Sequence, residues 1–236
     1  MKYLNLIPVP NQELAKEISG AMKGAESLGT TLDMAVVDYG PASIEGEYDE
    51  ALASAAILDT CAKAGQYDGV FINCFGDPGV RAAREFLGVP VFGGFEPPIL
   101  LALGLADKIG VVTVLKHVVP MIKGNIKKAG WEDRVPSVRV VNIPVLDLDK
   151  ADSLIDAIAE EAKNAIEQDG VEAIVLGCTG MAGATDKVHA YLSDAGYDVP
   201  VVDPTLAAVK LLEVYGALGL KPSRLTYMPI REKERK

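Results

Sequence analysis

The chain has 236 residues, long enough for one large α/β domain or two smaller lobes, and its composition, 49% hydrophobic and 24% charged, is that of an ordinary soluble globular protein. Its net charge of −10 argues against a nucleic-acid partner, because no basic stripe is present to replace phosphate counterions. No segment approaches the ~18 apolar residues that a membrane span needs, and the N-terminal apolar run is too short for a signal peptide core. We therefore expect a cytoplasmic protein that acts on a small molecule and binds neither nucleic acid nor membrane. We also expect it to form a homo-oligomer.

Short apolar segments alternate with longer amphipathic segments along the whole chain. Several short segments are β-branched and apolar without alternation, which is typical of parallel strands buried on both faces. The expected strands are 3–7, 32–37, 69–73, 89–92, 109–114, 138–143, 173–176 and 199–202, and the clearest helices are 12–26, 49–64, 118–129 and 151–168. This βαβα rhythm predicts an α/β fold with right-handed crossovers.

An internal repeat divides the chain. The sequence Val-Pro-Val occurs at 89–91 and again 110 residues later, and each copy precedes an acidic residue, a proline and an apolar helix. Two strand ends bear Cys74 and Cys178, which are 104 residues apart, and a longer turn after Cys178 absorbs the difference. We therefore expect two pseudo-symmetric Rossmann-like lobes, each a mainly parallel sheet flanked by helices. Their approximate boundaries are 1–94 plus 204–236 for the first lobe and 95–203 for the second.

Cys74 and Cys178 each follow a buried strand and open a glycine-containing turn. Ligands bind beyond the carboxyl ends of parallel strands, and a helix N-terminus can bring the pKa of a thiol towards neutrality. Asp77, followed by Pro78, has the pattern of a helix N-cap. Racemisation needs one group that takes a proton from one face of a carbon and a second that delivers a proton to the other face. Two cysteines on facing lobes meet this requirement if their sulfur atoms lie roughly 7–9 Å apart.

The third cysteine and the two histidines give little support for a metal site or a cofactor site. Cys61 lies on the apolar stripe of the helix 49–64, so we assign it to packing. His117 and His189 form no ligand pair with a cysteine, and no dinucleotide or phosphate-binding motif is present, so we expect no metal and no cofactor. Two alternatives stay open: a single-cysteine hydrolase that pairs Cys74 with His117 in the cleft, and a non-catalytic small-molecule binding protein.

With these loops in view, the chain resembles the Asp/Glu/hydantoin racemase superfamily, and most closely its hydantoin and allantoin racemase branch. The resemblance covers nearly the whole chain. The segments that carry it are Cys74-Phe75-Gly76-Asp77-Pro78-Gly79, Gly177-Cys178-Thr179-Gly180-Met181 and Val199-Pro200-Val201-Val202-Asp203-Pro204, together with Ala207-Ala208-Val209.

The resemblance implies two Rossmann-like lobes with the active site in the cleft, without metal, pyridoxal phosphate or nucleotide. It makes Cys74 and Cys178 the two acid/base residues. Backbone donors of Phe75-Gly76 and Thr179-Gly180 would hold the carbonyl oxygens of the substrate and stabilise an enolate. The expected substrate-binding residues are Asn11, Phe75, Gly76, Asp77, Thr113, Thr179 and Gly180.

Two departures from the family pattern bear on the substrate. Phe75-Gly76 stands where the amino-acid racemases of the superfamily carry Asn-Thr, which favours a ring or amide substrate over free aspartate or glutamate. The loop Pro8-Val9-Pro10-Asn11-Gln12 replaces an Asn-Pro-Asn-Ser/Thr type of sequence and leaves Asn11 to face the substrate. We expect a cofactor-independent racemase or epimerase of a 5-substituted hydantoin, allantoin or a similar carbonyl-activated centre. An amino-acid racemase and a cysteine-dependent isomerase or decarboxylase of a small acid are the alternatives.

Overall fold

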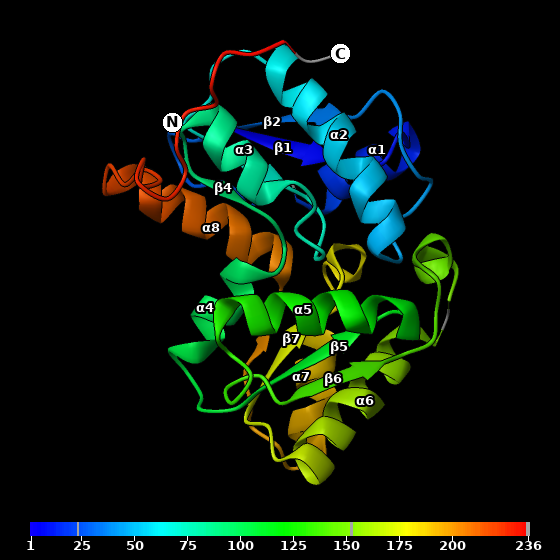
Figure 1. Ribbon diagram of the computed structural model, residues 1–236. Coiled ribbons are helices and arrows are strands. Elements are labelled where there is room, and N and C mark those ends of the chain that lie inside the picture. Colours follow the sequence, from blue (N-terminus) through cyan, green and yellow to red (C-terminus); the bar gives the residue numbers. More distant parts are fainter. Residues whose placement is uncertain (23, 152, 235–236) are drawn as a thin grey trace.

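Two four-stranded parallel sheets with the same topology form the framework (Figure 1). The computed structural model describes residues 1–22, 24–151 and 153–234. The strand orders are β2-β1-β3-β4 and β6-β5-β7-β8, so each strand of the first sheet has a counterpart at the same place in the second. The predicted α/β fold with two related lobes is therefore confirmed. None of the helices in the described part of the chain has both the length and the hydrophobicity that a bilayer crossing requires.

The first half of the chain supplies the first sheet. Its elements are β1 (Lys2–Ile7), α1 (Gln12–Ala21), β2 (Thr31–Val36), α2 (Glu47–Lys63), β3 (Gly69–Ile72), α3 (Val80–Leu87), β4 (Val91–Phe92) and α4 (Glu96–Leu103). The second half repeats this order with β5 (Ile109–Thr113), η1 (Lys116–Val118), α5 (Val119–Ala129), β6 (Ser137–Val140), η2 (Val145–Lys150), α6 (Leu154–Asp169), β7 (Ala173–Leu176), η3 (Thr179–Met181), α7 (Thr185–Asp194), β8 (Val201–Val202) and α8 (Pro204–Ala217).

The central strands are buried on both faces, as their uninterrupted apolar sequences predict. All residues of β3, β5 and β7 are buried. The Val-Pro-Val copies occupy equivalent places, because the carbonyl of Pro90 accepts a hydrogen bond from Val70 and that of Pro200 accepts one from Ile174, both at 2.9 Å. Each proline lacks an N–H group, and β4 and β8 begin only after it.

Several predicted boundaries were wrong. The helix predicted over 12–26 ends at Ala21, and the strand predicted over 138–143 ends at Val140, two residues before Asn142 enters the left-handed region with φ of 58°. Asp77 is not an N-cap. It also has φ of 58°, and α3 begins at Val80, after Gly79 with φ of 68°.

The fourth helix of each half packs on the sheet of the other half. Helix α4, which follows β4, packs against β5, β7 and β8, whereas α8, which follows β8, packs against β3 and β4. In Figure 1 the orange helix α8 accordingly lies with the blue and cyan elements of the first sheet. We call the first sheet with the helices packed on it, including α8, the first lobe, and the second sheet with its helices, including α4, the second lobe.

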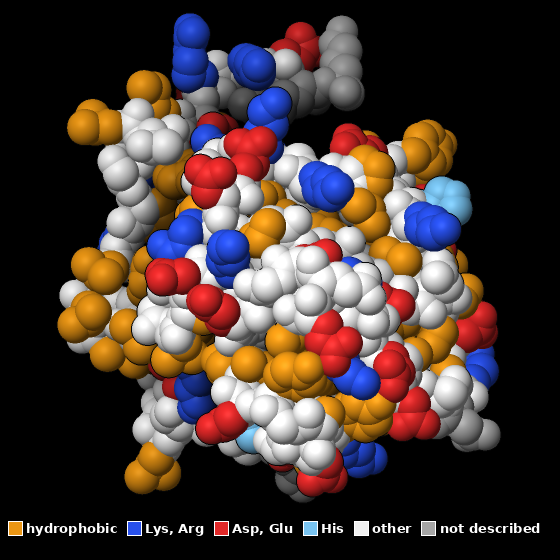
Figure 2. All heavy atoms as spheres, turned by 90° about the horizontal axis from the view of Figure 1, so that it is seen from below, with side chains coloured by type: hydrophobic (Ala, Val, Ile, Leu, Met, Phe, Trp, Pro, Cys, Tyr) orange, Lys and Arg blue, Asp and Glu red, His pale blue; other side chains and the backbone are white. Residues whose placement is uncertain are grey.

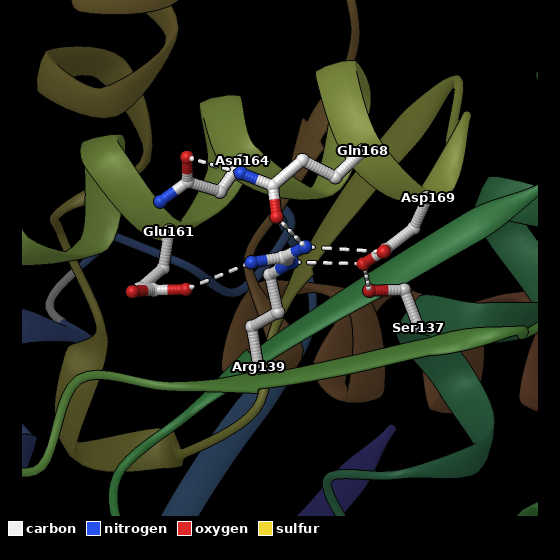
Figure 3. A network of polar contacts seen from close by, with 6 residues as sticks. All are labelled: Ser137, Arg139, Glu161, Asn164, Gln168 and Asp169. Atoms are coloured by element: carbon white, nitrogen blue, oxygen red, sulfur yellow. Dashed lines mark hydrogen bonds and ion pairs between the residues drawn. The ribbon is translucent and has the colours of Figure 1, made fainter.

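An arginine on an edge strand ties β6 to α6 (Figure 3). The Arg139 guanidinium donates to both carboxylate oxygens of Asp169, at 2.8 and 3.1 Å, and forms an ion pair with Glu161 at 3.5 Å. Ser137 donates to the same Asp169 carboxylate at 2.6 Å. The two-point contact holds the pKa of Asp169 below its usual value, mainly through the hydrogen bonds from Arg139. This network fastens the outer strand of the second lobe without contributing to the cavity described next.

Candidate active site

A cavity of about 630 Å³ lies between the two lobes, at the carboxyl ends of the strands, where ligands bind in parallel sheets. Both Cys74 and Cys178 line it, one from each lobe, whereas Cys61 does not. The other lining residues are Ile7, Pro8, Val9, Asn11, Glu13, Leu14, Ile18, Met22, Ala42, Ser43, Ile44, Asn73, Phe75, Gly76, Thr113, Val114, Val118, Met121, Ile122, Val145, Leu146, Leu148, Lys150, Leu154, Gly177, Thr179, Gly180 and Ala182.

The two cysteine loops have the same local design. Cys74 and Cys178 each stand two residues before a glycine, and the N–H group of that glycine, Gly76 or Gly180, donates to the sulfur atom. A Cβ at Gly76 would lie 2.9 Å from Cε of Met121, and one at Gly180 would lie 2.9 Å from Cδ1 of Leu148. Glycine therefore lets an apolar side chain close over each loop. These N–H groups therefore stabilise thiolates. That backbone donors of Phe75-Gly76 and Thr179-Gly180 also hold the carbonyl oxygens of a substrate stays a prediction.

The thiols are not poised near neutral pH. Burial raises the pKa of Cys178 to about 11 and raises that of Cys74 well above its usual value, and the hydrogen bonds from Gly180 and Gly76 offset only part of this effect. The Cys178 and Asp77 groups raise the pKa of Cys74 further, and the Glu45 carboxylate raises that of Cys178. The predicted shift of the thiol pKa values towards neutrality is thus wrong, because desolvation outweighs one or two backbone donors.

The cavity contains most of the predicted substrate-binding residues. Asn11, Phe75, Gly76, Thr113, Thr179 and Gly180 all line it. The Asn11 side chain accepts hydrogen bonds from the N–H groups of Glu13 and Leu14, both at 3.0 Å, so it caps α1. The Thr113 hydroxyl donates to the carbonyl of Gly177 at 2.8 Å, and this bond joins the ends of β5 and β7 beside Cys178.

Asp77 does not line the cavity. Its carboxylate accepts a hydrogen bond of 2.9 Å from the N–H group of Phe95, at the start of α4. The prediction that Asp77 contacts the substrate is therefore corrected: its side chain points to the segment that joins the lobes. His117 is exposed and also lies outside the cavity lining, which removes the geometric basis for a Cys74-His117 pair.

Sequence reasoning missed Asn73, which precedes Cys74 and lines the cavity. Its amide donates to Asn5 at 3.2 Å, while its Oδ1 atom is buried without a hydrogen-bond partner. Sequence reasoning also missed two loops that follow equivalent strands, β2 and β6, and that cover the cavity with Ile44 and Leu148. The Glu45 carboxylate accepts a 3.0 Å hydrogen bond from the N–H group of Val145 and so joins these loops across the lobes. The sequence did contain a signal for Asn73, because a polar residue directly after a buried strand, as Asn73 is after β3, is expected near a site at the carboxyl end of the sheet.

Known proteins are similar to this chain in sequence and architecture. The family model of the Asp/Glu/hydantoin racemases matches residues 11–212. A hydantoin racemase of Pseudomonas sp. (strain NS671) is 38% identical over 232 residues, covering 95% of this chain and 91% of that protein. The crystal structure of an allantoin racemase from Pseudomonas fluorescens superposes with a TM-score of 0.93 at 32% identity, over 100% of both chains. A maleate isomerase from Pseudomonas putida S16 shares the fold alone, with a TM-score of 0.62, 18% identity and coverage of 94% and 95%. The chain therefore belongs to the Asp/Glu/hydantoin racemase family of isomerases.

Proposed function

We propose that this protein is a cofactor-independent racemase of 5-substituted hydantoins in which Cys74 and Cys178 are the two acid/base residues. One observation carries the proposal: a single interlobe cavity holds one cysteine from each lobe, each with a backbone N–H group directed at its sulfur. A planar enolate that forms between the two sulfur atoms can be protonated from either side.

The reaction balances with the two thiols alone. One cysteine, as thiolate, takes the proton from C5 of the hydantoin, and the electron pair of the C–H bond moves into the adjacent carbonyl. The other cysteine, as thiol, delivers its proton to the opposite face of C5. The first cysteine ends as thiol and the second as thiolate, so the enzyme is then set to convert the opposite enantiomer. The N–H groups of Gly76 and Gly180 hold whichever sulfur is ionised.

The composition of the cavity wall supports an apolar group at C5. Most lining side chains are apolar, with Met121 and Phe75 among them, and the two charged side chains in the lining, Glu13 and Lys150, are exposed to solvent. Such a wall offers no buried cation for a free α-carboxylate, which disfavours amino-acid substrates. The capping role of Asn11 uses its oxygen and leaves its amide nitrogen to donate to a ring carbonyl.

Allantoin is the second candidate substrate, because of the similarity to the Pseudomonas fluorescens allantoin racemase. It carries a polar ureido group at C5. Polarimetry of single enantiomers of 5-isobutylhydantoin, 5-benzylhydantoin, allantoin, aspartate and glutamate separates the candidates. We expect the two apolar hydantoins to lose optical rotation fastest and the amino acids to keep theirs. Faster racemisation of allantoin would assign the second candidate, and racemisation of aspartate or glutamate alone would overturn the proposal.

We further propose that the protein works in the cytoplasm, as a homo-oligomer. The support for the compartment is that its three cysteines are free thiols. The support for the oligomer is that leucine side chains are exposed on α8 and in the turns that follow α4 and α8, namely Leu105, Leu206, Leu218 and Leu220. Figure 2 shows hydrophobic side chains (orange) at several places along the left edge of the molecule. Sedimentation velocity of the wild type and of Leu105→Lys tests this: a wild-type monomer would contradict it.

A further inference from the structure

The segment that links the two lobes passes between the two cysteine loops. A Cβ at Gly93 would overlap the Asp77 carboxylate, and one at Gly94 would lie 2.9 Å from Cγ2 of Thr179 and 3.1 Å from Cα of Phe75. Phe75 follows Cys74, and Thr179 follows Cys178. The two glycines therefore let both loops approach the same short stretch of backbone, and any side chain there would force them apart.

Two hydrogen bonds attach the Cys74 loop to this linker. The N–H group of Gly94 donates to the carbonyl of Cys74 at 2.9 Å, and the N–H group of Phe95 donates to the Asp77 carboxylate at 2.9 Å. Asp77 reaches this position through a left-handed backbone conformation with φ of 58°, which few residues other than glycine, asparagine and aspartate adopt. The loop is thus attached at Cys74 and again three residues later.

We propose that Asp77 is a positioning residue, which fixes the sulfur of Cys74 relative to that of Cys178 by anchoring the Cys74 loop to the linker at Phe95. This inference rests on the proposed two-cysteine racemisation. Asp77 touches no substrate; it acts through the loop that carries Cys74. A displacement of about 1 Å in such a group is enough to slow proton transfer by roughly a hundredfold.

The carboxylate that forms this anchor belongs to the Cys74 loop, whereas the Cys178 loop is tied in the opposite sense: the N–H group of Gly183 donates to the carboxylate of Asp203, after β8, at 3.2 Å. Counting from each cysteine, the residue of the second loop that corresponds to Asp77 is Met181, which packs in the second lobe and has no carboxylate. Loss of the hydrogen bond between Asp77 and Phe95 should therefore slow proton transfer by Cys74 more than proton transfer by Cys178.

The anchor does not depend on the charge of Asp77. The pKa of Asp77 is raised to about 8, mainly by burial and also by Glu96, while the N–H groups of Phe95 and Glu96 and the Arg84 guanidinium offset part of the increase. The protonated carboxyl keeps an oxygen that accepts the hydrogen bond from Phe95. An asparagine keeps this acceptor and tolerates the left-handed backbone, so Asp77→Asn should preserve the anchor.

The experiment compares Asp77→Gly with Asp77→Asn. Glycine removes the carboxylate without straining a backbone with φ of 58°. Asn142→Gly is the matched control, because Asn142 has the same φ of 58°, is exposed and lies outside the cavity lining. Each protein is assayed in deuterated water for exchange of the C5 hydrogen of each 5-benzylhydantoin enantiomer. Amide hydrogen exchange of the peptides around 74–78 and 93–96 is measured by mass spectrometry without substrate.

We expect Asp77→Gly to lose amide protection at Gly94 and Phe95 and to slow exchange of one enantiomer, the one deprotonated by Cys74, by roughly tenfold or more. Exchange of the other enantiomer should change far less, and KM should change little. With the assays run at pH 7, where a carboxyl group with a pKa of about 8 is mostly protonated, Asp77→Asn and Asn142→Gly should resemble the wild type. Unchanged amide protection in Asp77→Gly would overturn the anchor whatever the substrate is. If Asp77→Gly loses amide protection but slows exchange of both enantiomers equally, Asp77 has only a general structural role and the positioning role is wrong. Loss of amide protection without any slowing of exchange would lead to the same conclusion. If the wild type exchanges neither enantiomer, the proposed function fails, while the amide measurement still decides whether the anchor exists.

Discussion

The hydroxyl group of Thr179 donates a hydrogen bond of 3.3 Å to the backbone carbonyl of Asn73. Asn73 immediately precedes Cys74 and Thr179 immediately follows Cys178, so the bond joins the two cysteine loops directly across the lobes. Its donor side chain is buried, and its methyl group faces Gly94 of the linker.

Thr179→Val keeps the methyl contact and removes the hydroxyl. We expect a loss of about 1–3 kcal/mol in the free energy of unfolding, because the Asn73 carbonyl then loses its partner, together with a lower kcat for both enantiomers. Urea denaturation and polarimetry measure the two effects. Thr179→Ser keeps the hydroxyl and should retain more activity than Thr179→Val; the reverse order would show that the methyl contact, not the hydrogen bond, holds the loops.

Serine substitutions separate two-base racemisation from any single-cysteine mechanism. Cys74→Ser should lower racemisation by orders of magnitude, because it removes the base for one enantiomer and the acid for the other. In deuterated water this variant should exchange the C5 hydrogen of one enantiomer faster than it racemises it, and Cys178→Ser should do the same with the opposite enantiomer. Nuclear magnetic resonance and polarimetry follow the two rates. Wild-type racemisation by Cys178→Ser would falsify the two-cysteine mechanism. Cys61→Ala is the control, since Cys61 is buried away from the cavity, and it should turn over normally.

The pH dependence of activity should be alkaline. The base must be a thiolate, and burial raises the pKa of both cavity thiols, that of Cys178 to about 11. Below its pKa the thiolate fraction grows about tenfold per pH unit, so kcat/KM of the free enzyme should rise from pH 7 to 10. Alkylation of both thiols by iodoacetamide should likewise become faster as the pH rises, as judged by peptide mass spectrometry. A plateau of kcat/KM at pH 7 would contradict the raised pKa values.

Two carboxylates should tune the thiols separately. Glu45 raises the pKa of Cys178, whereas Glu50 raises that of Cys74. Glu45→Gln keeps an oxygen for the N–H group of Val145 and removes the charge, so the alkylation profile of Cys178 should move to lower pH while that of Cys74 stays in place. Glu50→Gln should do the opposite. Equal shifts of both profiles in either variant would show a change in the whole cavity rather than a local field.

The positions of Cys74 and Cys178 could be predicted because they depend on short patterns of neighbouring residues in the sequence. The repeated Val-Pro-Val sequence and the strands before Cys74 and Cys178 predicted two equivalent sheets, and both cysteines line the cavity between them. The role of Asp77 could not be predicted in this way. Its sequence suits a helix cap, but its partner is the N–H group of Phe95, eighteen residues further along the chain.

The prediction of thiol pKa values near neutrality was wrong for a similar reason. The local pattern around each cysteine contains the favourable backbone donors, and these are present. The larger opposing effect is burial, and the covering residues come from remote segments: Met121 lies over the Cys74 loop and Leu148 over the Cys178 loop. The apolar helices after Glu96 and Asp203 were predicted, and the predicted lobe boundaries, 1–94 plus 204–236 and 95–203, place each of them in the lobe opposite to its own half of the chain.

The exchange of α4 and α8 between the lobes makes each half of the chain incomplete. A half-length chain ending after α4 would leave that helix without the β5-β7-β8 surface on which it packs. Such a chain could bury α4 only as a homodimer, in which the α4 helix of each copy packs on the sheet of the other copy. Such a pair would hold two identical cysteine loops about a twofold axis, with no chemical distinction between the bases that serve the two enantiomers. Joining the halves in one chain removes that constraint, and Asp77 on one side and Met181 on the other are differences that only the joined form can have.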